Sequence, residues 1–108
     1  MNNHIFHKLA DILFKNVEKN IDDYCGKSDI DFEINTNMIV ITFENKSKII
    51  INRQEPLHQI WLATKNLGYH FKYVNKQWIC NRTHKNFWNV LEESCSNQAN
   101  EKITFYHI

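Results

Sequence analysis

The sequence has few of the residues that interrupt regular structure: only two glycines and one proline occur among its 108 residues. It also lacks long apolar runs. A membrane-spanning helix needs roughly 18–20 apolar residues, and the longest candidate here is the short segment 38–43. These absences exclude collagen-like and low-complexity chains and predict that no segment enters a membrane. With 43% hydrophobic and 23% charged residues, the composition is typical of a single globular domain over residues 1–108.

Sequence signatures of common catalytic and zinc sites are missing as well. Three cysteines, Cys25, Cys80 and Cys95, form no CxxC pair and are odd in number. Unpaired thiols fit a reducing compartment, so we expect a cytoplasmic protein in which each cysteine is an apolar filler or a surface residue. There is no P-loop, dinucleotide fingerprint or GxSxG motif, and we expect no enzymatic active site.

The chain has no strong excess of either charge, because its net charge is only +1. The charges are unevenly distributed, however. Residues 18–33 carry six acids and two lysines, whereas residues from 34 onward carry five acids and nine lysines or arginines. The basic residues are spread thinly, so nucleic-acid binding is disfavoured.

Apolar residues near the N-terminus recur at steps of three and four, which predicts an amphipathic helix of about five turns. The stripe consists of Phe6, Leu9, Leu13, Val17, Ile21 and Tyr24. Gly26 is expected to end this helix in a left-handed conformation. A second helix is predicted from Thr83, as N-cap, to about Gln98.

Between the helices the apolar period changes to two. Residues 29–34 alternate without a fault, which predicts a strand with one apolar face and one acidic face. Further strands are expected over 38–43, 47–52, 58–63, 69–73 and 77–80. The predicted fold is α+β, a two-layer sandwich with two helices on one face of an antiparallel sheet of about six strands. The C-terminal segment is expected to pack along the helices through Ile103, Phe105 and Tyr106.

Five acids follow one another closely from the end of the first helix into the first strand: Asp22, Asp23, Asp29, Asp31 and Glu33. They form either a solvated face or a landing surface for cations or a basic partner. Alternate strand residues stand roughly 6.6–6.8 Å apart, so neighbouring carboxylates cannot share one coordination sphere. Any metal binding is therefore expected to be weak, multiple and hydrated, and to favour hard cations.

Strand parity also places Gln59 and Trp61 on the solvent side of the sheet. Trp61 is either partly covered by its neighbours or an interface hot spot. Among the six histidines, His7 is the best accessory metal ligand because it lies on the first helix.

Four segments resemble the bacterial frataxin family, also called the CyaY family. They are SDIDFEI, ITFENKSKIIINRQEPLHQIWLATKNLGYHF, QWICNR and FWNVLEE, in this order and at this spacing. The most specific part is NRQEPLHQIWLA, and the resemblance covers essentially the whole chain.

This resemblance implies two parallel helices against an antiparallel sheet and a non-catalytic role in iron–sulfur cluster assembly. The family binds Fe2+ and Fe3+ weakly and docks on the complex of cysteine desulfurase and scaffold protein. The implied iron-binding residues, which we name the acidic ridge, are Asp11, Glu18, Asp22, Asp23, Asp29, Asp31 and Glu33. The implied partner-binding residues are Asp22 and Asp23 together with a sheet-face group, Asn52, Gln54, Gln59 and Trp61. A monomer is expected, with iron-dependent oligomers as an option.

The chain departs from the family pattern at Lys19, Cys25 and Lys27, which occupy ridge positions that are commonly acidic. Two lysines weaken the field of the ridge, which keeps open a metal-independent interaction module. A ferroxidase that uses His7 with nearby carboxylates is a third interpretation, although the sequence has no paired ExxH motif.

Overall fold

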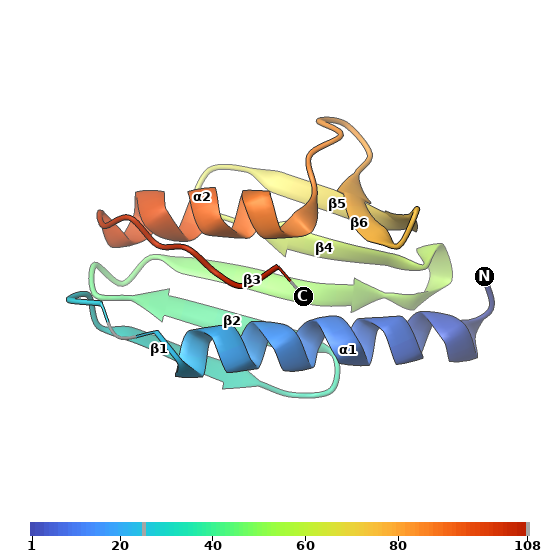
Figure 1. The fold of residues 1–108 in the computed structure, drawn as a ribbon, viewed down its shortest axis with the longest axis horizontal. Coiled ribbons are helices and arrows are strands. Elements are labelled where there is room, and N and C mark those ends of the chain that lie inside the picture. The colour runs from blue at the N-terminus through green and yellow to red at the C-terminus, as the bar shows by residue number, and fades with distance from the viewer. Residues whose placement is uncertain (25, 108) are drawn as a thin grey trace.

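The computed structural model describes residues 1–24 and 26–107. Two helices flank a run of strands (Figure 1). In chain order the elements are α1 (Asn3–Asp22), β1 (Ile30–Ile34), β2 (Met38–Phe43), β3 (Lys48–Gln54), the 3-10 turn η1 (Glu55–Leu57), β4 (Gln59–Ala63), β5 (Gly68–Val74), β6 (Gln77–Cys80) and α2 (Phe87–Ala99). No helix in the described ranges has the length and apolar character needed to cross a membrane.

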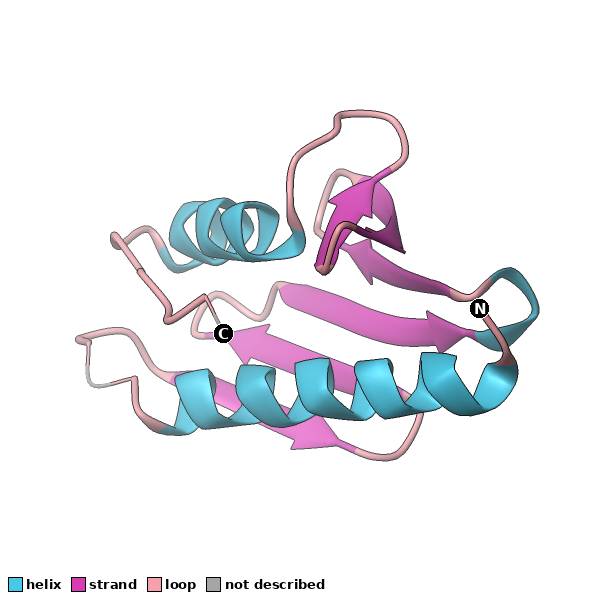
Figure 2. Ribbon diagram, turned by 45° about the vertical axis from the view of Figure 1, so that its right-hand side comes forward, coloured by secondary structure: helices cyan, strands magenta, loops and turns pink. Residues whose placement is uncertain are grey.

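The six strands form one antiparallel sheet whose spatial order is the sequence order, β1 to β6. Both helices cover the same face of this sheet, α1 over β1 and its neighbours and α2 running from β6 to β3 (Figures 1 and 2). The predicted two-layer α+β sandwich is confirmed. The alternation of the strands explains it, because the sheet has one apolar face and the amphipathic helices can cover only that face.

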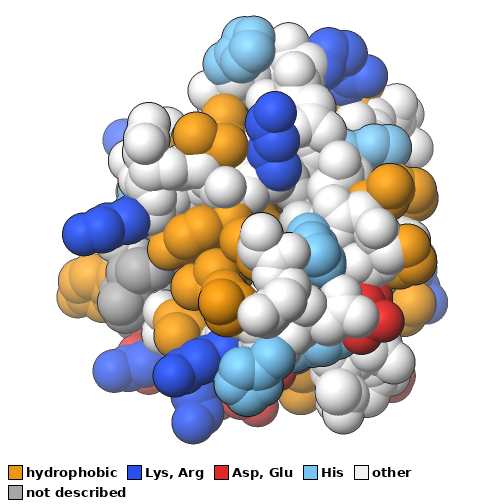
Figure 3. Space-filling model, turned by 90° about the vertical axis from the view of Figure 1, so that its right-hand side faces the viewer, with side chains coloured by type: hydrophobic (Ala, Val, Ile, Leu, Met, Phe, Trp, Pro, Cys, Tyr) orange, Lys and Arg blue, Asp and Glu red, His pale blue; other side chains and the backbone are white. Residues whose placement is uncertain are grey.

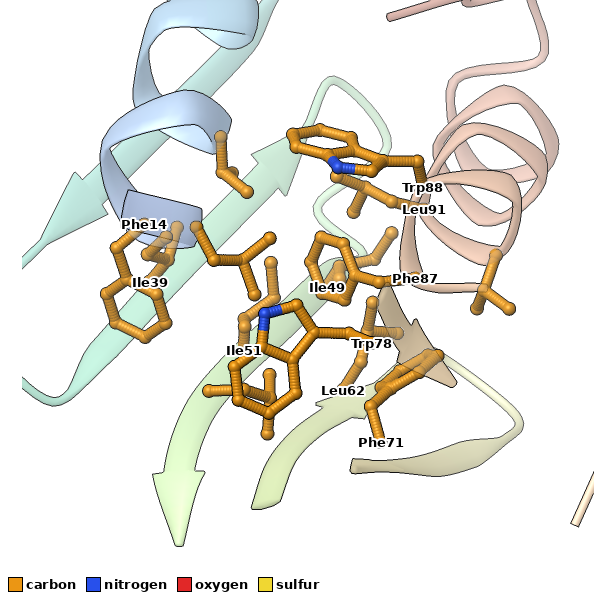
Figure 4. Packing of buried hydrophobic residues seen from close by; sticks show 14 of the residues in the cluster. Phe14, Ile39, Ile49, Ile51, Leu62, Phe71, Trp78, Phe87, Trp88 and Leu91 are labelled. Carbon is orange, nitrogen blue, oxygen red and sulfur yellow. The ribbon is translucent and has the colours of Figure 1, made fainter. Parts of the chain in front are cut away.

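The core lies between the sheet and the helices (Figure 4). From the sheet, Ile39, Ile41, Ile49, Ile51, Ile60, Leu62 and Phe71 point inward and are almost completely buried. From the helices, Phe6 and Val17 of α1 and Phe87 and Leu91 of α2 meet them. Each buried side chain of this size contributes about 1.5–3 kcal/mol, so this layer holds the two helices on the sheet.

The helix ends differ from the prediction. Asn2 caps α1 by accepting the backbone N–H of Ile5 at 2.8 Å, and the helix ends at Asp22 with Asp23 in a right-handed conformation. Because Asp23 is the C-cap, the predicted capping role of Gly26 is wrong. Asn86, not Thr83, caps α2, because the left-handed backbone of His84 turns the chain before the helix begins. The Thr83 hydroxyl instead accepts the N–H of Lys85 within that turn.

The C-terminal segment packs against the helices as an extended chain. Ile103 is buried, and its backbone N–H donates to the Ser96 hydroxyl at 2.8 Å. Phe105 packs against Trp88, with ring centroids 6.3 Å apart. The expectation for Tyr106 is wrong, since its side chain is exposed and only its backbone is held, by the Asn20 amide.

Two of the cysteines lie in the hydrophobic core as free thiols. Cys80 and Cys95 are both buried, as expected for apolar fillers. Burial raises the pKa of the Cys95 thiol to about 12, so this thiol stays neutral. The prediction for Cys25 falls outside the described residues.

Candidate functional site

Strand β1 presents three carboxylates to solvent at the edge of the sheet. Asp29, just before the strand, and Asp31 and Glu33 within it are exposed, while Ile30 and Phe32 pack against the core. The predicted parity is therefore confirmed. Ile34 departs from it with 37% exposure, because it ends a strand that has a neighbour on one side only.

The end of α1 brings two further carboxylates, Asp22 and Asp23, to the end of the molecule where β1 begins (Figure 1). Both are exposed. Negative charge at a helix C-terminus is disfavoured by about 0.3–1 kcal/mol at the surface, so these two acids oppose the helix dipole. They continue the row of acids from the strand onto the helix.

The loop between α1 and β1 is tied to the C-terminal end of α2. The Glu101 carboxylate accepts the backbone N–H of Lys27 at 3.1 and 3.2 Å and also the Tyr24 hydroxyl, and the Ser28 hydroxyl donates to the Ala99 carbonyl at 3.1 Å. The Tyr24 hydroxyl is the main cause that lowers the pKa of Glu101, and the N–H groups of Lys27 and Ser28 add to it. Burial, followed by the bond to Glu101, raises the pKa of Tyr24. A Cβ on Gly26 would collide with both contacting side chains, which explains the glycine.

Most of the acidic ridge is free of partners. Within residues 1–24 and 26–107, no ion pair involves Glu18, Asp22, Asp23, Asp29, Asp31 or Glu33. No group of three or more His, Cys, Asp or Glu side chains in those ranges could hold a metal ion. The separated carboxylates thus fit a hydrated, weakly held cation and not an enclosed coordination site. The side chains of Lys19 and Lys27 are also exposed along this surface.

Asp11 is the exception among the ridge residues. Its Oδ1 lies 2.5 Å from Nη2 of Arg53, whose side chain is only 4% exposed. The guanidinium also lies over the Phe14 ring at 4.7 Å, and its Nη1 is 3.1 Å from His7 Nδ1. Because Arg53 donates to Nδ1, the His7 proton lies on Nε2, which contacts the Glu55 carboxylate. Asp11 is therefore neutralised by a buried arginine, and both ring nitrogens of His7 are engaged.

Arg53 did not emerge from the sequence as a functional residue. The signal for it was the alternation of β3, where Ile49 and Ile51 point inward and Arg53 continues the same parity. An inward arginine requires a counter-charge, and α1 supplies it.

The sheet-face group lies together on the outer face of β3 and β4. Asn52 pairs with Trp61 and Gln54 with Gln59 across the two strands. Gln54 Nε2 donates to Asn52 Oδ1, and Trp61 Nε1 donates to Gln59 Oε1, both at 2.8 Å. All four side chains are half-buried. They form one ordered polar surface around an indole.

His70 belongs to the same surface although the sequence analysis gave it no role. It faces Trp61 across the β4–β5 pair, and the two rings stack with centroids 4.0 Å apart and an interplanar angle of 9°. This stack half-buries Trp61, which confirms that the indole is partly covered by its neighbours, while the hot-spot interpretation stays a prediction. The register of the β4–β5 hairpin, which sets His70 opposite Trp61, is the feature from which this stack could have been predicted.

The acidic ridge on β1 and the sheet-face group share the outer face of one sheet. Between them, Glu33 pairs with Val40, Val40 with Ile50, and Ile50 with Ala63. At about 4.8 Å per strand, the three steps from β1 to β4 span roughly 14–15 Å. A single macromolecular partner could therefore cover both groups, across an apolar strip in the middle.

Comparison with known proteins agrees with this architecture. A family model for the frataxin-like domain matches residues 1–101. A frataxin structure from Psychromonas ingrahamii, described as a model for stability modulation within the CyaY protein family, has 38% identity and a TM-score of 0.89, covering 99% of this chain and 100% of that one. Trimeric frataxin from the yeast Saccharomyces cerevisiae shares the fold with 21% identity and a TM-score of 0.67, covering 87% and 78%. With the sandwich, the acidic edge and the sheet-face group in place, the chain belongs to the frataxin family, in the branch known as CyaY.

Proposed function

We propose that this protein regulates iron–sulfur cluster assembly by docking on the complex of cysteine desulfurase and scaffold protein, with iron held weakly on the acidic ridge. The frataxin family has roles in iron–sulfur cluster assembly. The observation that carries the proposal is the set of unpaired carboxylates along α1 and β1, of which those on β1 share the outer face of the sheet with the sheet-face group. The role requires no active site, and we place the protein in the cytoplasm as a monomer.

The chemistry of the ridge supports iron as cargo and not as a resident cofactor. Carboxylate oxygens are ligands for hard cations, and the separated side chains let a hydrated ion bind and leave. Glu18, Asp22, Asp23, Asp29, Asp31 and Glu33 would hold it, since Asp11 is occupied by Arg53. A ferroxidase centre based on His7 gains no support, because both nitrogens of that ring already have partners.

The same carboxylates support docking on a basic protein surface. Several like charges on one edge steer an oppositely charged partner and give an association rate that falls with salt. The Trp61 indole, half-buried on His70, offers the aromatic anchor found at interface hot spots.

The decisive experiment is the rate of cluster formation by the cognate cysteine desulfurase and scaffold, with and without this protein, over a range of Fe2+ concentrations. An effect that depends on iron supports the proposal. An effect that persists unchanged across the iron range favours the metal-independent interaction module, which the exposed Lys19 and Lys27 also favour. No effect at any iron concentration would overturn both.

Charge reversal tests the docking surface separately from the cargo. Asp22→Lys combined with Asp23→Lys should weaken desulfurase binding at low salt and leave the thermal transition nearly unchanged, because both side chains are exposed. Glu44→Lys, on an exposed acid of the β2–β3 turn that forms no ion pair with the described residues, is the control for a charge reversal away from the ridge. Equal affinities of the double variant and the wild type at low salt would refute docking through the ridge.

Substitution of the indole tests the sheet-face group. Trp61→Ala should weaken partner binding at least tenfold, as expected for a hot spot, with a small change in melting temperature. A large fall in melting temperature with unchanged binding would show that the indole only supports the sheet.

A further inference from the structure

A cavity of about 460 Å³ opens on the helix layer, on the side of the sheet opposite the sheet-face group. Its walls come from α1, the β5–β6 hairpin and the start of α2, and include Leu9, Leu13, Lys76, Trp78, Phe87 and Trp88. Viewed from the end where α1 begins, apolar side chains gather in the middle of the surface with lysine and histidine side chains around them (Figure 3). The size is that of a small-molecule site, which usually holds 300–1,000 Å³.

Two indole N–H groups at this cavity have no partner in the protein. Trp78 is 6% exposed and Trp88 is 8% exposed, and both rings reach toward α1 (Figure 4). Neither indole nitrogen hydrogen-bonds to any described residue, yet neither is sealed in, because Arg53 Nε is the sole enclosed and unpaired side-chain atom in the described ranges. The cavity, which both side chains line, is the space left for an acceptor. Each of these tryptophans is more than nine-tenths buried and its N–H has no partner in the described protein, so an acceptor in the cavity would give it a hydrogen bond that no protein group supplies.

The charged groups around the cavity carry no negative charge. The lining contains no Asp or Glu, and Lys76 adds an ammonium group that forms no ion pair. The Asn86 Oδ1 acceptor is already used by the N–H of Asn89. The imidazole of His107 is turned toward Glu92, at 2.9 Å. The lining therefore offers two indole donors and one unpaired cation above an apolar floor, together with the Tyr73 hydroxyl and the Gln77 amide, which can donate or accept.

We propose that this cavity binds a small amphipathic monocarboxylate. Its apolar body would lie on Leu9, Leu13 and Phe87, and its carboxylate would accept from the indole N–H groups and meet the Lys76 ammonium. The apolar floor disfavours multiply charged ligands, and the absence of carboxylates in the lining disfavours cations. The site is independent of the acidic ridge and of the docking proposed above.

Octanoate is a suitable probe, with 1-octanol as its uncharged match. The protein has three tryptophans, so their indole N–H resonances in a 1H–15N spectrum report three places at once. We expect octanoate to shift the Trp78 and Trp88 signals saturably, with a dissociation constant on the order of 1 mM. The Trp61 signal, whose N–H is bound to Gln59 on the other face, should stay in place. Octanol should bind several-fold more weakly.

Two variants and one control separate the charge from the cavity itself. Lys76→Asn removes the ammonium at a left-handed position that asparagine tolerates, and should weaken octanoate binding about three- to fivefold. Lys46→Asn makes the same change at another left-handed position away from the cavity, and should have no effect. Ile12→Glu places a negative charge at the rim on a residue that is 53% exposed, and should abolish binding without unfolding the protein. The proposal is overturned if octanol binds as well as octanoate, if all three indole signals shift alike, or if none shifts.

Discussion

Asp11 and Asp31 are both exposed aspartates of the acidic ridge, yet their electrostatic surroundings differ. Asp31 projects from the edge strand β1 with no ion pair among the described residues, whereas Asp11 is bound to a guanidinium that is almost completely buried. Exposure of a carboxylate therefore does not make it available to a cation. A carboxylate is available to a cation only when no buried charge of the protein already forms an ion pair with it.

The buried charge is costly to hold, which explains how strongly Asp11 is engaged. Arg53 extends from the inner face of β3, where the preceding inward residues are isoleucines, and its Nε has no partner. Its charge is stabilised by Asp11, by His7 and by the Phe14 ring. Asp11 thus supports the fold, while the other ridge carboxylates form no ion pair with the described residues.

The largest expected effect comes from removing the guanidinium. Arg53→Ala should lower the free energy of unfolding by about 2–4 kcal/mol, because it leaves a cavity beside Phe14 and removes the link between α1 and β3. Arg53→Met, which keeps most of the volume, should cost less. Urea unfolding measures both, and a loss under about 1 kcal/mol for the alanine variant would show that the arginine is not structural.

A smaller effect is expected from Asp11→Asn. It leaves the buried guanidinium without its counter-charge and should cost about 1–2 kcal/mol. In the Arg53→Met background the same substitution should cost almost nothing, so a double-mutant cycle isolates the pair. Additive effects in that cycle would mean that Asp11 and Arg53 are not coupled.

The Glu101 carboxylate holds Tyr24 and Lys27, which lie between the acids of α1 and those of β1. These hydrogen bonds make the stability of the protein depend on pH. Because the pKa of Glu101 is lowered in the folded state, its contribution to stability is present above the ordinary carboxyl range and is lost as the pH falls through the lowered value. Glu101→Gln should therefore destabilise the protein at pH 7, by less than the two substitutions above. The difference from the wild type should shrink below the ordinary value of 4.5 and vanish in stronger acid. A difference that is constant from pH 7 to pH 2 would contradict this assignment.

The smallest effect on stability is expected at Asp31. Asp31→Asn should change the free energy of unfolding by less than about 0.5 kcal/mol, because the side chain has no partner to lose. The same substitution should weaken Fe2+ binding, measured by calorimetry under anaerobic conditions. Asp11→Asn is the matched variant and should show the reverse: a stability loss with little change in Fe2+ binding.

The sequence predicts the architecture well because its two periods are clear. The steps of three and four from Phe6 onward and the strict alternation over 29–34 identify the first helix and the edge strand, and the remaining strands agree within a few residues. Helix ends are less predictable since they depend on local backbone geometry. The left-handed turn at His84 moves the start of α2 from Thr83 to Phe87, and Gly26 serves to leave space for Tyr24 and Glu101.

The candidate site is predictable in its members but not in their pairing. Parity places the acids of β1, and also Gln59 and Trp61, on the outer face, as the structure has them. The link from Arg53 to Asp11 joins residues 42 positions apart, and the stack of Trp61 on His70 depends on the register of a hairpin. Such contacts arise from packing, which no local pattern encodes.

The strand order β1 to β6 also bears on how the chain folds as it leaves the ribosome. Every strand pairs with the one made just before it, so the sheet can grow one hairpin at a time. Helix α1 is made first, but the residues that cover its apolar stripe are made later, first the isoleucines of β2 and β3 and then Trp78. Until about half of the chain has emerged, that stripe faces water, which makes the nascent helix a natural binding site for a chaperone.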